Sequence, residues 1–430
     1  MKSSGLSLPL SCVLSVGVAC ALGGCGSGDE RAVPLSDGSF FTQRPNPGSE
    51  GFVPWGNRLT TATRQVPEEL VAIETFQAIG IAITPGGRLF LSAPRWHEGH
   101  GDSVLEFFPG SPTPPQAWPD QAWNAWSPGV PGDVAFVCVQ AMHVDGAGRM
   151  WVLDTGAPNF EGPVQGGAKL IRFDTEQNKL GSSFVFDPSA APPGSYLNDV
   201  RIDAQRGFAY MSDSGLGAIV ALDLTTGVAA RFLDDHPSTE AEAIRLTIGG
   251  EPWVNDDTGL SPAVHSDGIA LSPDGDHLYY QALTARTLYR VPTGPMREVL
   301  RPTRRALSEA DAVESDTARW IGATISDLDE LVENLGETFA TDAMIMDKNG
   351  VLYFTALERD AITARLPSGE LTVVTADDRL VWPDSFCIHN GLLYVTTARI
   401  HEVGFNNPAG PVGDGPFTVL RVPLLDPMVD

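Results

Sequence analysis

The sequence predicts an all-β fold, a six-bladed β-propeller with four-stranded blades, and three observations support this prediction. One two-stranded pattern recurs six times along the chain, and such self-similarity indicates a repeat architecture. Each copy has apolar residues at alternate positions, as strands do, and a turn rich in Asp, Gly and Asn, as hairpins do. The 45 glycines and 34 prolines among 430 residues favour many turns and few long helices.

The six copies lie in order, and a further strand follows several of them. The copies are Ala78–Leu91, Val139–Val152, Leu197–Met211, Ser266–Tyr280, Thr341–Phe354 and Pro383–Val395, and the further strands are Ala168–Asp174, Ala218–Leu224 and Thr287–Val291. A β-sandwich does not repeat one hairpin in this way, whereas propeller blades do. Strands near Val66–Glu74 and at Thr418–Pro423 are expected to pair and close the ring. The gap Phe232–Val264 leaves room for a seventh, degenerate blade.

The N-terminal residues are expected to direct export. Residues 1–24 combine Lys2 with an uncharged, mostly apolar stretch, which is typical of a signal peptide. The run Leu22-Gly23-Gly24-Cys25 resembles a bacterial lipobox, so Cys25 is the predicted lipidation site. A plain cleaved signal and an uncleaved membrane anchor are the alternatives. We expect an exported protein, either a cell-envelope lipoprotein (outer membrane or periplasm) or an extracellular protein.

The rest of the chain divides by composition. Residues 25–65 are predicted to be a linker and N-terminal extension, and residues 66–425 the propeller, with an insertion between blades at 301–336. Within the propeller the cysteines are Cys138 and Cys387. They either pair, which an exported compartment permits, or remain buried thiols.

The net charge restricts the partners. The chain carries 54 acidic and 28 basic residues, a formal charge of −26. This charge argues against a nucleic-acid partner, which needs a basic stripe, and against electrostatic attachment to an anionic membrane. The expected membrane contact is therefore limited to a lipid anchor at Cys25. A small-molecule ligand is the expected partner, and the negative field favours cations or amines.

Equivalent positions of the six copies define a column of side chains facing the central channel. The innermost strand of each blade lines the channel, and its side chains alternate between two directions. The column comprises Ile79, Gln140, Asn198, Asp267, Asp342 and Asp384. Two residues further on, each copy has an apolar residue: Ile81, Met142, Val200, Ile269, Met344 and Phe386. We therefore expect a polar layer at one end, whose five polar members are the candidate ligand-binding residues.

Converging carboxylates repel one another unless something positive joins them. Ca²⁺ accepts oxygen ligands of this kind, and Asn198, Asp267 and Asp342 are the candidate metal ligands. A protonated amine and partial protonation of the Asp cluster are equally consistent with the pattern. The structural alternative is that these residues cap turns or satisfy buried amides. The acid–base candidates are Asp199 and His265, beside the column.

Several motifs, in order from about residue 66 to 400, resemble the major royal jelly protein / yellow family. The most specific are Trp151-Val152-Leu153-Asp154-Thr155-Gly156 and Asp267-Gly268-Ile269-Ala270-Leu271-Ser272-Pro273 with Leu278-Tyr279-Tyr280, and Val381-Trp382-Pro383-Asp384 is supportive. The resemblance implies a six-bladed propeller, export and a central ligand pocket. Insect members are linked to melanin-pathway indoles and to binding biogenic amines.

A more distant resemblance is to the gluconolactonase / senescence marker protein family. Asn198 matches that family's substrate-contacting Asn, while Asp267 and Asp342 match a metal-ligand Asn and a metal-ligand Asp. Asp267 still offers oxygen ligands. The metal-ligand Glu of the first blade, however, corresponds to Ile79 or a neighbour, which cannot coordinate a metal ion.

Two functions are consistent with these observations. The first is the binding of a small amine or indole-like ligand in the central channel. The alternative is a Ca²⁺-dependent hydrolase of the lactonase type, in which the metal polarises the carbonyl and a carboxylate activates water. We favour binding because the sequence shows no complete acid–base or nucleophile set. Whether the chain is an enzyme stays open at this point.

Overall fold

The computed structural model describes residues 32–34, 40–42, 59–61, 65–301, 328–402 and 415–426. The chain divides into two compact units, Met1–Phe52 and Val53–Asp430. The first contains an antiparallel strand pair, β1 (Ala32–Pro34) with β2 (Phe40–Thr42). The predicted signal peptide and Cys25 lie outside the described residues, as does most of the predicted linker 25–65.

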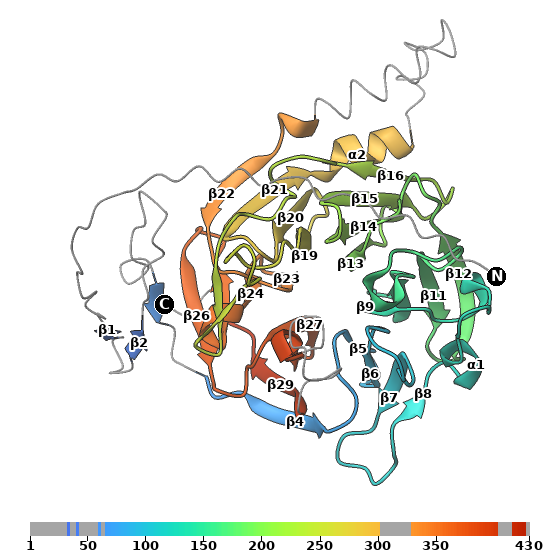
Figure 1. Ribbon diagram of the computed structural model, residues 1–430, viewed down its shortest axis with the longest axis horizontal. Helices are drawn as coiled ribbons and strands as arrows, with labels where there is room; N and C mark the ends of the chain where they lie inside the picture. The colour runs from blue at the N-terminus through green and yellow to red at the C-terminus, as the bar shows by residue number, and fades with distance from the viewer. Residues whose placement is uncertain are drawn as a thin grey trace, which may run out of the picture. The chain divides into compact units, whose positions relative to one another are not determined.

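Six sheets of the second unit are arranged in a ring (Figure 1). Each sheet runs from an inner strand to an outer strand and, except at the outer edges of the fifth and sixth sheets, consecutive strands of the chain are neighbours in the sheet. The first and second strands of every sheet form an antiparallel pair joined by a short turn, as the repeated turn residues predict. The predicted all-β propeller of six four-stranded blades is therefore confirmed.

The first three blades contain consecutive strands. The first consists of β5 (Ile81–Ile83), β6 (Leu89–Ser92), β7 (Val104–Phe107) and β8 (Gln116–Ala117). The second consists of β9 (Val139–Val144), β10 (Arg149–Asp154), β11 (Lys169–Asp174) and β12 (Lys179–Val185). The third consists of β13 (Leu197–Asp203), β14 (Phe208–Asp213), β15 (Ala218–Asp223) and β16 (Ala229–Phe232).

The last three blades complete the ring. The fourth consists of β19 (Ser266–Leu271), β20 (His277–Ala282), β21 (Thr287–Pro292) and β22 (Glu333–Glu337). The fifth consists of β23 (Met344–Met346), β24 (Leu352–Ala356), β25 (Ala361–Arg365) and β26 (Leu371–Ala376), with β3 (Leu59–Thr61) added in parallel to β26. The sixth consists of β27 (Pro383–His389), β28 (Leu392–Thr397), β29 (Phe417–Pro423) and β4 (Glu68–Ile73).

Two features of the chain path bear on the sequence predictions. β4 pairs antiparallel with β29, so an early strand completes the last blade and closes the ring, as expected. The segment 301–336, expected to be an insertion between blades, ends in β22, which pairs with β21 as the outer strand of the fourth blade. Residues 302–327 of that segment lie outside the described residues.

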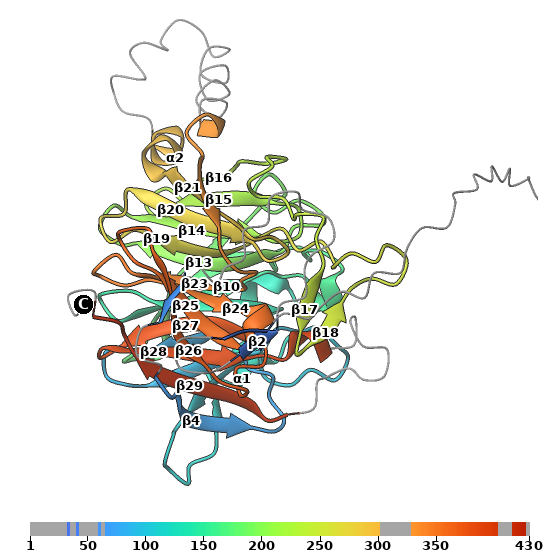
Figure 2. The ribbon, with the colours of Figure 1, turned by 90° about the vertical axis from the view of Figure 1, so that its left-hand side faces the viewer.

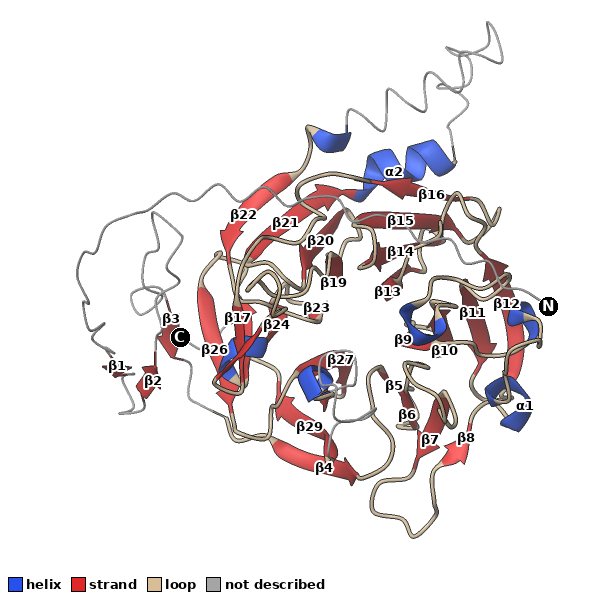
Figure 3. Cartoon of the chain, in the orientation of Figure 1, coloured by secondary structure: helices blue, strands red, loops and turns tan. Residues whose placement is uncertain are grey.

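In the described part of the chain the helices are short and lie between strands (Figure 3). They are α1 (Gln121–Asn124), α2 (Thr293–Leu300) and the 3₁₀ turns η2 (Gly132–Val134), η3 (Pro158–Phe160), η4 (Leu357–Arg359) and η5 (Ile400–Glu402). Within the described ranges, no helix has the length and apolar character needed to cross a membrane.

The segment 232–264, where a seventh blade had room, contains a hairpin instead. β17 (Leu246–Ile248) and β18 (Glu251–Trp253) form a separate two-stranded sheet. Figure 2 shows this hairpin on one face of the ring. We call it the cover hairpin.

The apolar core lies between the blades and not at the centre of the ring. Each pair of neighbouring blades shares one buried apolar cluster; Phe90 and Val152, for example, pack between the first and second blades. Side chains alternate between the two faces of each sheet, and apolar side chains on each face pack against the neighbouring sheet. The apolar clusters therefore form between the blades. The innermost strands are therefore left to line the centre.

Irregular pairing turns the column positions toward one end of the channel. In β13, β19 and β27 the pairing with the second strand shifts at the column residue, so two residues oppose one: Asn198–Asp199, Asp267–Gly268 and Asp384–Ser385. Such β-bulges re-aim side chains and occur often beside functional sites. Their recurrence gives the column a shared geometry that plain strand alternation would not produce.

Hydroxyl groups of the second strands join neighbouring blades at this level. Ser92 Oγ accepts a hydrogen bond from the Gly80 amide (3.1 Å) and donates to the Gln140 carbonyl of the next blade (3.0 Å). Thr396 Oγ1 likewise donates to the Ile79 carbonyl (2.7 Å). A Cβ atom at Gly80 would lie 2.8 Å from the Gln140 carbonyl oxygen, so only glycine permits this approach.

The Trp-Val-Leu-Asp-Thr-Gly motif has a structural role. Asp154, at the end of β10, accepts hydrogen bonds from the amides of Val137, Cys138 and Gly156. Lys169 Nζ lies 2.6 Å from Asp154 Oδ2, and neither side chain is exposed. This ion pair holds the segment that leads into β9, and therefore the position of Gln140.

Replacing Lys169 with Met should lower the free energy of unfolding by about 3–5 kcal/mol, because it leaves the Asp154 carboxylate buried without its counter-ion. Urea denaturation followed by tryptophan fluorescence measures this change. The exposed Lys179 provides the matched control, and Lys179→Met should stay within about 0.5 kcal/mol of wild type. Equal stability of the two variants would contradict the role given to the ion pair.

Candidate functional site

The polar column lies at one end of the channel, where the innermost strands begin. Asp267, Asp342 and Asp384 are 2%, 5% and 2% exposed, and Gln140 is 5% exposed. Asn198 is half-buried. The three carboxyl groups interact electrostatically, since the charges of Asp342 and Asp384 both act on Asp267. The structure therefore brings together the carboxyl groups that the repeat placed in one register.

Burial and mutual repulsion favour the protonated carboxyl groups. Burial raises the pKa of Asp267 well above its ordinary value, and the neighbouring charges of Asp342 and Asp384 raise it further. The pKa of Asp384 is also raised well above its ordinary value, by burial and by Asp342. Burial raises the pKa of Asp342 to about 7, against a lowering effect of its hydrogen bond from Trp382.

The neighbours of the carboxyl groups leave them only partly satisfied. Trp382 Nε1 donates to Asp342 Oδ2 (2.7 Å), and Ser385 Oγ donates to Asp384 Oδ1 (3.0 Å). Asp384 Oδ2 is buried and has no hydrogen-bond partner. A buried carboxylate oxygen without a donor is costly. This end of the channel therefore has unused capacity to accept hydrogen bonds.

Gln140 belongs to an aromatic cluster beside the carboxyl groups. Tyr196 donates its hydroxyl hydrogen to Gln140 Oε1 (2.8 Å), and Trp96 Nε1 donates to the Tyr196 oxygen (2.7 Å). Phe160 stacks between the rings of Trp96 and Tyr196, with centroid distances of 5.4 and 5.3 Å. Phe160 has a φ of 60°, an unusual conformation for an aromatic residue and one that tends to mark functional sites.

The remaining predicted residues have structural partners. Asn198 Nδ2 donates to Ser214 Oγ (3.2 Å). Asp199 accepts a hydrogen bond from Arg201 (2.7 Å), and burial raises its pKa although Arg201 opposes this shift. His265 Nδ1 accepts a hydrogen bond from the Ala241 amide (3.1 Å), so that nitrogen is not available to act as a base.

The cover hairpin packs at this end of the channel. Trp253 of β18 packs edge-on against Trp382, with ring centroids 5.1 Å apart. Leu246 and Ile248 of β17 join the same buried cluster, together with Ile79. Ile79, the apolar member of the column, therefore packs beneath the cover. Through Trp382, which donates a hydrogen bond to Asp342, the hairpin packs against one side of the carboxyl groups.

The three carboxyl groups are not arranged as a metal-binding cluster of side chains. Across the described ranges, no three His, Cys, Asp or Glu side chains lie close enough together to hold a metal ion. Asp342 accepts the Trp382 hydrogen bond, and Ile79, the equivalent residue of the first blade, offers no oxygen ligand in its side chain. Ca²⁺ takes six to eight oxygen ligands in roughly spherical array. Asn198, Asp267 and Asp342 alone provide fewer ligands than this, and a calcium site at these residues stays a prediction.

Sequence reasoning missed the residues that surround the carboxyl groups. Tyr196 and Trp382 each lie two residues before a column position, so period-two alternation could have placed both in the site. Trp253 lies in the cover hairpin, outside the repeat, and no pattern connects it to the column. Cys138 and Cys387 are both free thiols. Of the two alternatives for these residues, the structure therefore has the unpaired thiols and not the disulfide.

Similarity to known proteins shows to which family the chain belongs. The family model described as "Major royal jelly protein" matches residues 137–409. The chain belongs to the major royal jelly protein family. Similar curated proteins include major royal jelly protein 5 of Apis mellifera, 25% identical over 57% of this chain and 37% of that protein. Protein yellow of Drosophila madeirensis is 22% identical over 64% of this chain and 46% of its own length.

Alignments with the curated relatives thus span less than half of these two proteins. Among solved structures, the chain is similar to regucalcin, a calcium-binding protein of Agrobacterium tumefaciens, with a TM-score of 0.48, 14% identity and coverage of 85% of this chain and 95% of that one. It is also similar to a gluconolactonase of Xanthomonas campestris, with a TM-score of 0.41, 14% identity and coverage of 84% and 99%.

Asp342→Asn should stabilise this family member increasingly as the pH rises from about 4 to 8. The folded-state pKa of about 7 exceeds the ordinary value of 3.8, so the wild type loses stability as Asp342 ionises, by up to about 4 kcal/mol. Asparagine does not ionise and still accepts the Trp382 hydrogen bond. Urea denaturation at several pH values measures the difference between variant and wild type.

The buried histidines contribute equally to the stability of the variant and of the wild type, so their contribution cancels in this difference. Their effect on the pH dependence of stability is opposite to that of Asp342. Burial lowers the pKa of His100 to about 3 and that of His143 to about 4, so both add stability as the pH rises. Asp256→Asn, at an exposed position, should show no such pH trend. A stability gain for Asp342→Asn that is constant or shrinks with rising pH would contradict the raised pKa.

Proposed function

We propose that the covered end of the channel binds a small molecule with a protonated amine, of the amine or indole-like class that the family resemblance implies. The observation that carries the proposal is the unpartnered Asp384 Oδ2, buried beside the carboxyl groups of Asp267 and Asp342. Among the described residues, no lysine or arginine forms a salt bridge with any of these three groups. An ammonium group would supply the missing charge and donors.

The chemistry of an ammonium group suits this site. It offers three hydrogen-bond donors and no acceptor, and charge-assisted bonds to carboxylates are about twice as strong as neutral ones. Its charge would also remove the repulsion that keeps the carboxyl groups protonated. The formal charge of −26 raises the local concentration of cations near the protein.

Aromatic side chains offer contacts for the rest of such a ligand. Trp382 and Trp253 lie on the side of Asp342, and Tyr196 lies on the side of Gln140. Rings of this kind bind both indole faces and cations. Because the carboxyl groups are buried, entry of the ligand requires movement of the cover hairpin.

Binding at this end should depend on the carboxylate and on the ligand's charge. Tryptamine should bind the full chain in a 1:1 complex measured by isothermal titration calorimetry, and 3-methylindole, which lacks the amine, should bind much more weakly. Asp384→Asn should weaken tryptamine binding by roughly tenfold or more, since one charge-assisted hydrogen bond contributes about 1.5–3 kcal/mol. Affinity should rise between pH 5 and pH 8, because Asp342, with a pKa of about 7, must lose its proton.

The exposed Asp256 supplies the control variant, and Asp256→Asn should leave tryptamine affinity unchanged. Equal affinity for tryptamine and 3-methylindole, or an Asp384→Asn variant that binds like wild type, would refute the amine site. Turnover of a lactone that requires Ca²⁺ and is abolished by Asp342→Ala would replace the binding proposal with the hydrolase alternative.

We also propose export, with attachment to the cell envelope through Cys25. The support is the signal-like run of residues 1–24 and the lipobox-like Leu22-Gly23-Gly24-Cys25. Expression of the full chain in a bacterial host should place it in the membrane fraction, and Cys25→Ser should release it from that fraction. Retention of the Cys25→Ser variant in the membrane fraction would exclude a lipid anchor at this residue.

A further inference from the structure

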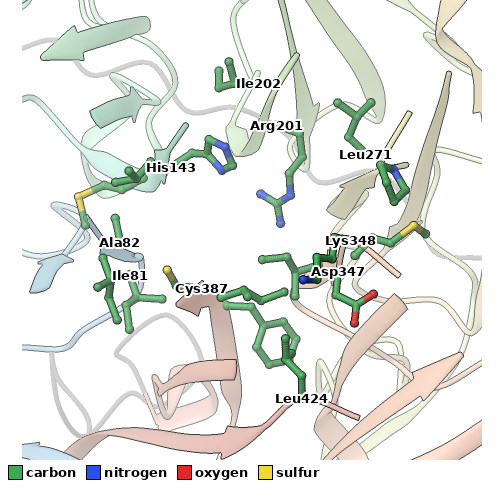
Figure 4. Close-up of a pocket in the computed structure, with 18 of the residues that line it drawn as sticks. Ile81, Ala82, His143, Arg201, Ile202, Leu271, Asp347, Lys348, Cys387 and Leu424 are labelled. Carbon is green, nitrogen blue, oxygen red and sulfur yellow. The ribbon is translucent and has the colours of Figure 1, made fainter. Parts of the chain in front are cut away.

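A second cavity lies at the opposite end of the channel, where the innermost strands finish. Its volume is about 540 Å³, within the range of about 300–1,000 Å³ for small-molecule pockets. Much of its wall is apolar, formed by residues that include Ile81, Met142, Ile202, Leu271, Phe386 and Leu424. Figure 4 shows Arg201 from β13 and His143 from β9 reaching into the space between these side chains.

Arg201 is a buried cation with unused donors. It is 8% exposed. Nη1 donates to Asp199 Oδ1 (2.7 Å) and to the Val200 carbonyl (2.7 Å), and Nη2 donates to the Met344 carbonyl. Nε is buried and has no hydrogen-bond partner. Nε and Nη2 form one edge of the guanidinium plane, the geometry that matches a carboxylate.

Of the other polar groups around the cavity, His143 and Cys387 contribute no charge, whereas Asp347 is a carboxyl group whose Oδ2 is buried without a hydrogen-bond partner. Burial lowers the pKa of His143 to about 4, so its ring is a neutral hydrogen-bonding group at physiological pH. Burial raises the pKa of the Cys387 thiol to about 11, so it carries no charge. Asp347 Oδ1 accepts the amides of Asn349 and Val351 in its own turn. Lys348, which is exposed, adds a positive charge at the rim.

We propose that this cavity binds a small amphipathic carboxylate, such as a medium-chain fatty acid or an arylalkanoic acid. The carboxylate would lie against Arg201 and the apolar portion against the wall. A neutral or cationic molecule would gain the apolar contacts but leave the guanidinium donors unmatched. The site takes the opposite charge from the proposed amine site and does not depend on it.

An apolar layer separates the two ends of the channel, and an ion pair connects them. The apolar layer that includes Val200 and Met344 lies between them, and the Asp199–Arg201 ion pair spans it. An anion on Arg201 competes with Asp199 for the guanidinium group. Asp199 acts electrostatically on Asp267, Asp342 and Asp384. Binding of an anion in the cavity should therefore change the electrostatic environment of these three carboxyl groups.

Calorimetric titration of the full chain with octanoate and with 1-octanol tests this site. Octanoate should bind in a 1:1 complex, and octanol, which has the same chain without the charge, should bind at least tenfold more weakly. Arg201→Gln should weaken octanoate binding by at least tenfold and leave octanol binding nearly unchanged. Arg421→Gln is the matched control, because Arg421 pairs with Glu68 on the outer side of the sixth blade; it should bind octanoate like wild type.

A second variant keeps the test decisive if Arg201→Gln fails to fold. Ile388 is half-buried and lines the cavity, so Ile388→Trp should fill part of the space and weaken octanoate binding at least tenfold while the Asp199–Arg201 pair stays intact. The absence of octanoate binding at millimolar concentration would overturn the proposal. Equal affinity for octanoate and octanol, or octanoate binding unaffected by Ile388→Trp, would overturn it as well.

Discussion

The burial of three carboxyl groups at one end of the channel is the constraint on which the rest of this site depends. Asp267, Asp342 and Asp384 lie together almost without solvent, and each disfavours the ionisation of the others. Two arrangements relieve this repulsion: protonation, as the raised pKa values indicate, or a bound cation. A protein that retains such a cluster carries a cost in stability, which a binding role would explain.

The fold holds this cluster in place by two separate devices. Bulges in the innermost strands aim the column residues at one end, and hydroxyl groups such as Ser92 and Thr396 tie each blade to the next at the same level. The cover hairpin packs against Trp382, the hydrogen-bond donor to Asp342. Because the apolar clusters lie between the blades, the centre is free for polar groups without loss of the core.

Much of the fold could be predicted because the repeat is visible in the sequence. Alternating residues and turn chemistry identify the hairpins, and their common register places Asp267, Asp342 and Asp384 at equivalent positions. The surroundings could not be predicted in the same way. Trp253 lies outside the repeat, and the Asp199–Arg201 pair depends on a bulge that strand alternation does not indicate. The metal hypothesis rested on residue types alone, whereas coordination depends on distances.

A crystal structure of the full chain with tryptamine at pH 8 tests the central claim most directly. The ammonium nitrogen should lie within about 3 Å of Asp384 Oδ2 and near the carboxyl oxygen atoms of Asp267 or Asp342, beneath the cover hairpin. Tryptamine bound elsewhere, with the three carboxyl groups arranged as they are without ligand, would contradict it. A metal ion coordinated by Asp267 and Asp342 would contradict it equally.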